Sequence, residues 1–80
     1  MQKWEYKFLM VDWANGSWRI YKDNGVETQD WKNSPSYIQV CNELGDQGWE
    51  MVTLSYTPVF NQTGEITRDF FRIVMKRPKS

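Results

Sequence analysis

Three tryptophans, Trp13, Trp18 and Trp31, lie in or beside a middle segment of the chain that holds few other apolar residues. An exposed indole near a cation can stack on a planar ligand such as a nucleotide, and Arg19 and Lys22 are close in the sequence. The pattern therefore predicts a ligand site at Trp13, Trp18, Arg19 and Trp31. The alternative interpretation, which stays open, is that the indoles fold back as a lid over a small sheet.

Residues that could perform catalysis or bind a metal are scarce. The chain contains no histidine and one cysteine, Cys41, so neither a nucleophile–base pair, a structural zinc site nor an intrachain disulfide can be assembled. Cys41 falls on the apolar stripe of a predicted helix, where a thiol acts as a small hydrophobic side chain. Glu5 and Glu50 each flank a tryptophan, and we expect cross-strand ion pairs with Lys7 or Arg72. We therefore expect no enzyme, no catalytic residue, no metal and no cofactor.

Size and composition indicate one small domain spanning residues 1–80. A chain of this length buries only about 60–65% of its unfolded surface, so each buried side chain must contribute a large apolar area. Five Trp, four Tyr and four Phe supply such area, and oligomerisation is another common source of stability. No run approaches the ~20 apolar residues of a membrane span, and the N-terminus lacks a secretory peptide's apolar core. We expect a cytoplasmic protein without a membrane partner.

Apolar periodicity predicts an α+β fold. Residues 3–12 and 17–22 alternate with a period of two, and an Asn-Gly pair between them is typical of a hairpin. Residues 23–34 contain a second Asn-Gly pair and predict a short ribbon or an exposed loop. Two further strands are expected at residues 49–56 and 66–77. We therefore predict an antiparallel sheet of about four strands with one helix packed on one face, in the order β-β-α-β-β.

The helix is predicted between a Ser-Pro start and a glycine end. Ser34 can cap the helix, and Pro35 suits the first helical position. One buried stripe follows at i, i+3, i+4 and i+7 spacing: Tyr37, Val40, Cys41 and Leu44. Gly48 can adopt the left-handed conformation that ends a helix. Trp49 or Met51 would then fill the gap between the end of the helix and the sheet.

Three segments carry distinctive motifs: WEYK at residues 4–7, LGDQGWEMV at residues 44–52 and KRP at residues 76–78. They resemble a family of small bacterial domains of unknown function, whose members open on Trp-Glu-Tyr-Lys, carry a Leu-Gly-x-x-Gly-Trp-Glu-Leu-Val junction and often end on Lys-Arg-Pro. Met51 replaces the usual leucine, and residues 13–34 are longer and richer in tryptophan than the family's middle segment. The resemblance implies a bacterial or phage protein and supports the fold. Because the family has no assigned activity, it leaves the function open.

The face of the sheet opposite the helix is expected to be apolar, with these residues available for self-association: Leu9, Val11, Phe70 and Val74. The alternating positions Trp4, Tyr6 and Phe8 are then expected on the helix side. A sheet covered by one helix should have a polar outer face, so an apolar one predicts a partner, of which a second copy is the simplest. Scattered exposed apolar residues are also common in monomers, and the inward face of residues 49–56 stays open.

Three functions follow from these patterns. The first is a non-enzymatic interaction module that forms a homodimer or higher homo-oligomer through its sheet. The first alternative is a protein that binds a planar or nucleotide-like small molecule at the tryptophans. The second alternative is weak nucleic-acid binding, because basic residues concentrate near the two ends of the chain and residues 12–50 are acidic. A formal net charge of zero argues against nucleic acid.

Overall fold

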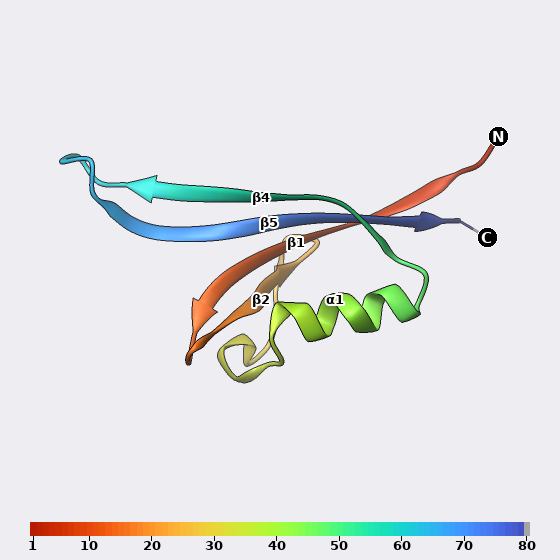
Figure 1. The fold of residues 1–80 in the computed structure, drawn as a ribbon, viewed down its shortest axis with the longest axis horizontal. Coiled ribbons are helices and arrows are strands. Elements are labelled where there is room, and N and C mark those ends of the chain that lie inside the picture. The colour runs from red at the N-terminus through yellow and green to blue at the C-terminus, as the bar shows by residue number, and fades with distance from the viewer. Residues whose placement is uncertain (80) are drawn as a thin grey trace.

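The computed structural model describes residues 1–79, which form five β-strands, a 3-10 turn and one α-helix. In chain order the elements are β1 (Trp4–Ala14), β2 (Ser17–Asp23), β3 (Val26–Glu27), η1 (Trp31–Asn33), α1 (Tyr37–Asp46), β4 (Glu50–Phe60) and β5 (Ile66–Pro78). The strands make one antiparallel sheet in the order β3-β2-β1-β5-β4, and α1 lies along one face of it (Figure 1). The predicted α+β class is confirmed. The predicted order β-β-α-β-β with four strands is wrong, because β3 adds a fifth strand before the helix.

Two Asn-Gly turns shape the first three strands. Asn15 and Gly16 have φ angles of 50° and 78°, and Asn24 and Gly25 have φ angles of 51° and 83°. Paired left-handed residues give a turn whose twist matches that of the flanking strands, and Asn-Gly adopts this conformation with little strain. The hairpin predicted at the first pair is therefore confirmed. The second pair reverses the chain again, so that Val26–Glu27 pairs with the end of β2.

The core lies between α1 and the middle of the sheet. Its buried residues come from three strands: Leu9 and Val11 of β1, Ile20 of β2, and Ile73 and Met75 of β5. The predicted helical stripe packs against them, together with other partly buried side chains: Trp18, Tyr37, Val40, Cys41, Leu44, Trp49 and Phe71. The 3.6-residue periodicity of the helix sequence thus identified the buried side of α1 correctly.

The helix begins two residues later than the predicted cap. Ser36 is the N-cap, and its hydroxyl oxygen accepts a hydrogen bond from the N–H of Gln39 at 3.4 Å. The hydroxyl of Ser34 instead donates to a carbonyl of η1. Pro35 therefore precedes the helix and lies between Ser34 and Ser36, whose backbones are both extended.

The chain leaves α1 through Gly48 and returns at once to the core. Gly48 has a φ of 93°, as predicted, and the N–H of Trp49 donates to the carbonyl of Leu44 at 3.0 Å. Trp49 then packs against the core, with the guanidinium carbon of Arg77 4.4 Å from its ring centroid. Met51 remains exposed, so Trp49 is the residue that fills the space at the end of the helix.

The two faces of β1 are the reverse of those predicted. Leu9 lies directly opposite Ile73 of β5 on the helix side of the sheet, and Leu9 and Val11 are only 3% and 0% exposed. These two residues are therefore unavailable for self-association. Phe70 and Val74 do lie on the outer face, but Phe70 is buried there beneath neighbouring side chains. The apolar residues of β1 occupy both faces, so pairing with β5, and not local alternation, decides which face meets the helix.

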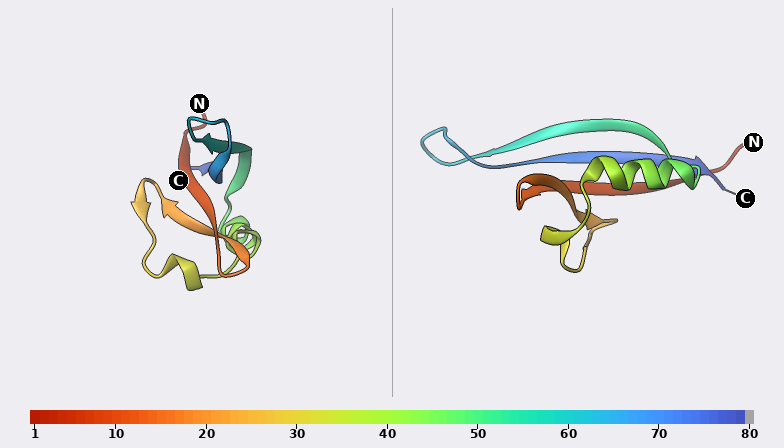
Figure 2. Two further views of the ribbon diagram at one scale, coloured as in Figure 1. Left: turned by 90° about the vertical axis from the view of Figure 1, so that its left-hand side faces the viewer. Right: turned by 60° about the horizontal axis from the view of Figure 1, so that its bottom comes forward.

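β4 and β5 form a long hairpin that projects beyond the rest of the sheet (Figures 1 and 2). The pairing of β1 with β5 ends at Phe71, so residues 57–70, which we call the arm, pair only within the hairpin. The Cα radius of gyration is 14.2 Å, whereas a compact chain of this length has a value of about 12 Å. The isolated chain is therefore elongated, with much of the arm in contact with solvent.

β4 continues past Pro58, although the sequence predicts that the strand ends before it. Pro58 lies opposite Asp69 of β5, and β4 is the outermost strand on its side of the sheet. A proline is tolerated in an edge strand when its backbone nitrogen, which has no hydrogen to donate, faces away from the neighbouring strand. The edge position of β4 thus explains why Pro58 does not interrupt it.

Candidate functional site

The structure separates the tryptophans that were predicted to bind a planar ligand. The rings of Trp13 and Trp18 meet edge to face on the helix side of the sheet, with centroids 5.4 Å apart. Trp18 also packs on Phe71 at 4.7 Å. Trp31 lies on η1, where its ring centroid is 4.9 Å from that of Tyr21. The three indoles pack on other aromatic rings and do not line one cleft.

Arg19, the fourth residue of the predicted ligand site, fastens the middle segment to the first hairpin. Its guanidinium donates to the carbonyl oxygens of Ala14 at 2.9 Å and Asn15 at 3.1 Å, and also to the carbonyl of Ser34. A backbone bridge between Arg19 and Ser36 continues this contact. The donors of Arg19 therefore point at backbone carbonyls, which gives this residue a structural role.

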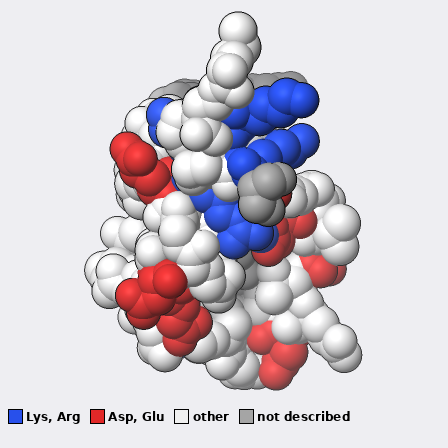
Figure 3. Space-filling view, turned by 90° about the vertical axis from the view of Figure 1, so that its right-hand side faces the viewer, with Lys and Arg blue, Asp and Glu red and all other residues white. Residues whose placement is uncertain are grey.

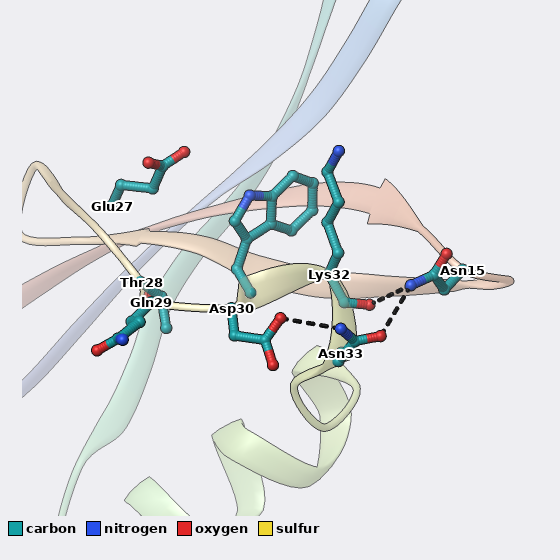
Figure 4. A pocket seen from close by; sticks show the side chains of 8 residues that line it. Asn15, Glu27, Thr28, Gln29, Asp30, Lys32 and Asn33 are labelled. Atoms are coloured by element: carbon teal, nitrogen blue, oxygen red, sulfur yellow. Dashed lines mark hydrogen bonds between the residues drawn. The ribbon is translucent and has the colours of Figure 1, made fainter.

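A hollow of about 480 Å³ lies beside η1 and is lined largely by polar residues (Figure 4). The amide of Asn15 donates to the side-chain oxygen of Asn33 at 3.1 Å, and the amide of Asn33 donates to Asp30 at 2.9 Å. Figure 4 shows the carboxylate of Glu27 and the amide of Gln29 pointing in different directions. The polar groups that line the hollow either bond to each other or point apart. They therefore do not converge on a position where a ligand could bind.

Cys41 packs against the core from α1 and is half-buried. Burial raises the pKa of its thiol. Within residues 1–79 no cluster of Asp, Glu, Cys and His is arranged to hold a metal ion. No helix in the same range is both long and apolar enough to cross a membrane.

We expect Cys41 to be alkylated slowly by iodoacetamide near neutral pH. Because burial disfavours the thiolate, the folded chain keeps the thiol proton to a higher pH than the unfolded chain does. At about pH 8 the folded protein should therefore react more slowly than the urea-unfolded protein, with a rate that rises as the pH passes the ordinary thiol pKa of 9.0. Because the thiol pKa is higher in the folded chain than in the unfolded chain, deprotonation of Cys41 at alkaline pH lowers the free energy of unfolding. Equal rates for folded and unfolded protein would contradict this expectation.

Ion pairs on the sheet follow the cross-strand pattern expected from the sequence, with different partners. Within residues 1–79 there are three: Lys7–Asp23, Asp12–Arg68 and Glu5–Arg77. Glu5 was predicted to pair with Lys7 or Arg72, but it pairs with Arg77, which lies directly opposite on β5. Glu50 forms no ion pair within the described residues. Each pair has at least one side chain that is a third or more exposed to water, so it contributes little to stability.

β4 is an open edge of the sheet, and its apolar side chains are exposed. None of its residues is buried, and the exposed fractions run from 40 to 57% for Met51, Val52, Leu54, Tyr56, Val59 and Phe60. No Lys, Arg, Asp or Glu occurs between Glu50 and Glu65. Natural edge strands are usually protected by charges, prolines, bulges or short length. Pro58 and two register shifts lie near the ends of β4, but residues 53–57 have no such protection.

The opposite edge of the sheet is closed. β3 has two residues and ends on the charged Glu27. The N–H of Thr28 donates to the carbonyl of Tyr21 at 2.9 Å, and Ser36 bridges to Arg19 further along the outside of β2. The sheet therefore has one protected edge and one open edge.

Pro58 indicates which backbone groups of β4 point outward. In an antiparallel ladder, residues alternate between positions that bond to the neighbouring strand and positions whose N–H and C=O face away from it. Because a proline has no N–H to donate, Pro58 belongs to the outward-facing set. The register with β5 is regular from Thr53 to Val59, so Leu54 and Tyr56 share this orientation. Their N–H and C=O groups face the open edge.

The outer face of β1 carries three exposed rings, Trp4, Tyr6 and Phe8, which we call the aromatic row. They are 37%, 51% and 57% exposed. Because the sequence prediction assigned them to the helix side, it missed them as a surface feature. Their alternation was visible in the sequence, and only the pairing of β1 with β5 shows that they face outward.

Comparison with known proteins gives no match to any family model, any curated protein or any solved structure. The resemblance to a family of small bacterial domains stays a prediction from three motifs. The function must therefore be argued from the surfaces of the chain itself, of which the β4 edge and the aromatic row are the most unusual.

Proposed function

We propose that this chain is a non-enzymatic interaction module that forms a homodimer by pairing the open edges of two β4 strands. The observation that carries the proposal is an eleven-residue edge strand without a buried residue, whose apolar side chains are 40–57% exposed. An edge of this kind readily accepts a strand from another chain. A second copy offers the same edge, and two-fold symmetry makes the contact self-complementary.

Antiparallel pairing about a two-fold axis at Ser55 suits the backbone of β4. It places Leu54 of one copy opposite Tyr56 of the other, and both residues direct N–H and C=O groups outward. Pro58 then lies opposite Val52, at the register shift near the start of β4, where a missing donor is tolerated. Ser55 faces its own symmetry mate in a non-hydrogen-bonded pair, with Cα atoms about 4.5 Å apart.

Side chains on the helix side of β4 also favour this pairing. Leu54 and Tyr56 of opposite copies become direct neighbours, and such a pair contributes roughly 0.2–1 kcal/mol relative to an alanine pair. The hydroxyl of Tyr56 donates to Asp69 at 2.9 Å, which orients the ring before association. This hydrogen bond also raises the pKa of Tyr56, so the phenol stays neutral over the physiological range.

The small core supports a protein whose stability is completed by a partner. Within residues 1–79 six hydrophobic residues are buried, and the chain is elongated. Chains of this size commonly gain stability from disulfides, metals or oligomerisation. With one cysteine and no metal cluster within the described residues, oligomerisation is the route that this chain supports.

Sedimentation equilibrium tests the association. We expect the mass of a dimer at micromolar concentrations, and a monomer mass maintained up to ~100 μM would overturn the proposal.

A cysteine variant tests the register in a Cys41→Ala background. Ser55→Cys should form an interchain disulfide under mild oxidation, because a separation of about 4.5 Å falls in the range that a disulfide spans. Thr63→Cys, at the tip of the arm, is the control and should stay reduced, since the tips lie far from the axis. A dimer in which Ser55→Cys fails to cross-link would exclude this register and leave the association itself in place.

A further inference from the structure

The aromatic row has the form of a platform on which bases can stack. Trp4, Tyr6 and Phe8 occupy alternate positions on one strand, so the Cα atoms of neighbouring members lie roughly 7 Å apart along it. All three face the side of the sheet that the helix leaves uncovered. Aromatic rings in proteins that bind single strands each hold one base, and such stacking tolerates any sequence because every base has a π-face.

Cations flank the aromatic row on the same face. Lys76 lies opposite Tyr6 on β5, and its Nζ is 4.3 Å from the ring centroid of Trp4. Arg72 on β5 and Lys22 on β2 lie on either side of Met10, which is the next residue of β1 on this face. Within residues 1–79 none of these three cations forms an ion pair. Each lies over an aromatic ring instead: Lys76 over Trp4, Arg72 over Phe70 and Lys22 over Tyr21. A ring does not cancel a cation's charge, so all three can still attract phosphates.

The acids on this face form no ion pair with these three cations within the described residues. Asp12 is held by Arg68, whose Nε donates to it at 3.0 Å. Glu50 lies opposite Lys76 and Glu27 lies opposite Lys22, and neither carboxylate reaches its neighbouring cation. Figure 3 views the end of the molecule where the two termini lie; Lys and Arg gather in its upper part, and Asp and Glu lie mostly lower. The formal net charge of zero therefore hides a basic region at the end of the molecule where the termini lie.

We propose that the outer face of β1 binds single-stranded nucleic acid, with bases stacked on the aromatic row and phosphates beside Lys22, Arg72 and Lys76. A second copy is a poorer occupant, because packing this face on itself would bury the same unpaired cations of both copies. A duplex also fits less well, since its bases are stacked on one another and offer no free ring faces. Pairing of β4 edges leaves the aromatic row uncovered, so this proposal goes beyond the dimer and stands or falls independently of it.

Fluorescence anisotropy with labelled oligonucleotides of about 12 nucleotides tests the proposal. Oligo(dT) and oligo(U) are the two probes, and their relative affinities show whether DNA or RNA is preferred. We expect at least one to bind with a salt slope (log K against log salt) of about −2, because three neutralised phosphates contribute about 0.7 each on a single strand. A DNA duplex of equal length should bind at least ~10-fold more weakly.

Two phenylalanines provide a matched pair of variants. Phe8 in the aromatic row and Phe60 at the end of β4 are both 57% exposed, and threonine keeps the strand propensity at either position. Phe8→Thr should weaken binding roughly 10-fold, whereas Phe60→Thr should change it less than ~2-fold. Circular dichroism would verify that both variants remain folded.

Several outcomes would overturn the nucleic-acid proposal. They are no binding of either oligonucleotide by the wild-type protein, equal loss in the two variants, and duplex binding as tight as single-strand binding. A fourth is that Phe8→Thr weakens self-association in sedimentation while neither oligonucleotide binds, in which case the aromatic row is a subunit interface. A wild-type monomer that still binds oligo(dT) or oligo(U) would contradict the dimer and leave this proposal standing.

Discussion

Replacing Leu54 by lysine is expected to convert the proposed dimer into a monomer. In the proposed pairing Leu54 lies opposite Tyr56 of the other copy and diagonal to its own symmetry mate, at a distance of roughly 7–8 Å. Two lysines would bring like charges to the centre of the contact and remove its apolar neighbours. We expect the dissociation constant measured by sedimentation equilibrium to rise at least ~100-fold, since both effects act twice across the axis.

The control for Leu54→Lys is Val26→Lys on β3. Val26 is also an exposed apolar residue of an edge strand, but it lies on the closed edge of the sheet. Its replacement should change the dissociation constant less than ~2-fold, because a single exposed charge far from the contact has little effect. A Leu54→Lys variant that still sediments as the wild-type dimer would show that association does not use β4.

Replacing Ile73 by alanine should lower the free energy of unfolding by about 2–5 kcal/mol, the usual effect of truncating a buried isoleucine. Ile73 is 0% exposed and lies at the centre of the sheet, opposite Leu9 of β1 and Leu54 of β4. A domain of this length has a total stability of about 4–12 kcal/mol, so the loss is a large share. Urea unfolding at one fixed protein concentration measures it, because the proposed dimerisation would make the apparent stability depend on concentration.

Ile66 offers the matched control for Ile73. It belongs to the same strand, β5, but is 55% exposed on the arm. Ile66→Ala should cost less than about 1 kcal/mol, which reflects strand propensity alone. Similar losses for the two variants would contradict the placement of the core between α1 and the middle of the sheet.

Local features of the sequence predicted the local structure well. The Asn-Gly pair at Asn15 predicted a turn because few other residues adopt two successive left-handed conformations. The helical stripe was found because 3.6-residue periodicity is visible within one segment. Gly48 marked the end of the helix because glycine readily adopts the left-handed conformation found there. Each of these features depends only on neighbours along the chain.

The faces of the sheet could not be predicted in this way. β1 has apolar side chains on both sides, and the choice between Leu9 and Phe8 as the inward residue depends on the register with β5, which is more than 60 residues distant in the sequence. The same non-local pairing makes β4 an edge strand and so exposes its uncharged segment. The packing of the predicted ligand residues was hidden for a related reason, because the rings of Trp18 and Trp31 contact aromatic rings of other elements.

The short β3 strand has a consequence for the size of the assembly. Each chain has one open sheet edge, and the proposed pairing through β4 would use the open edges of both chains. The merged sheet would then be bounded at each end by β3 and by residues 28–36, which lie along the outside of β2 and leave an incoming strand little backbone to bind. If the proposed pairing forms, association would therefore stop at two chains and would give a closed dimer instead of an open-ended fibre.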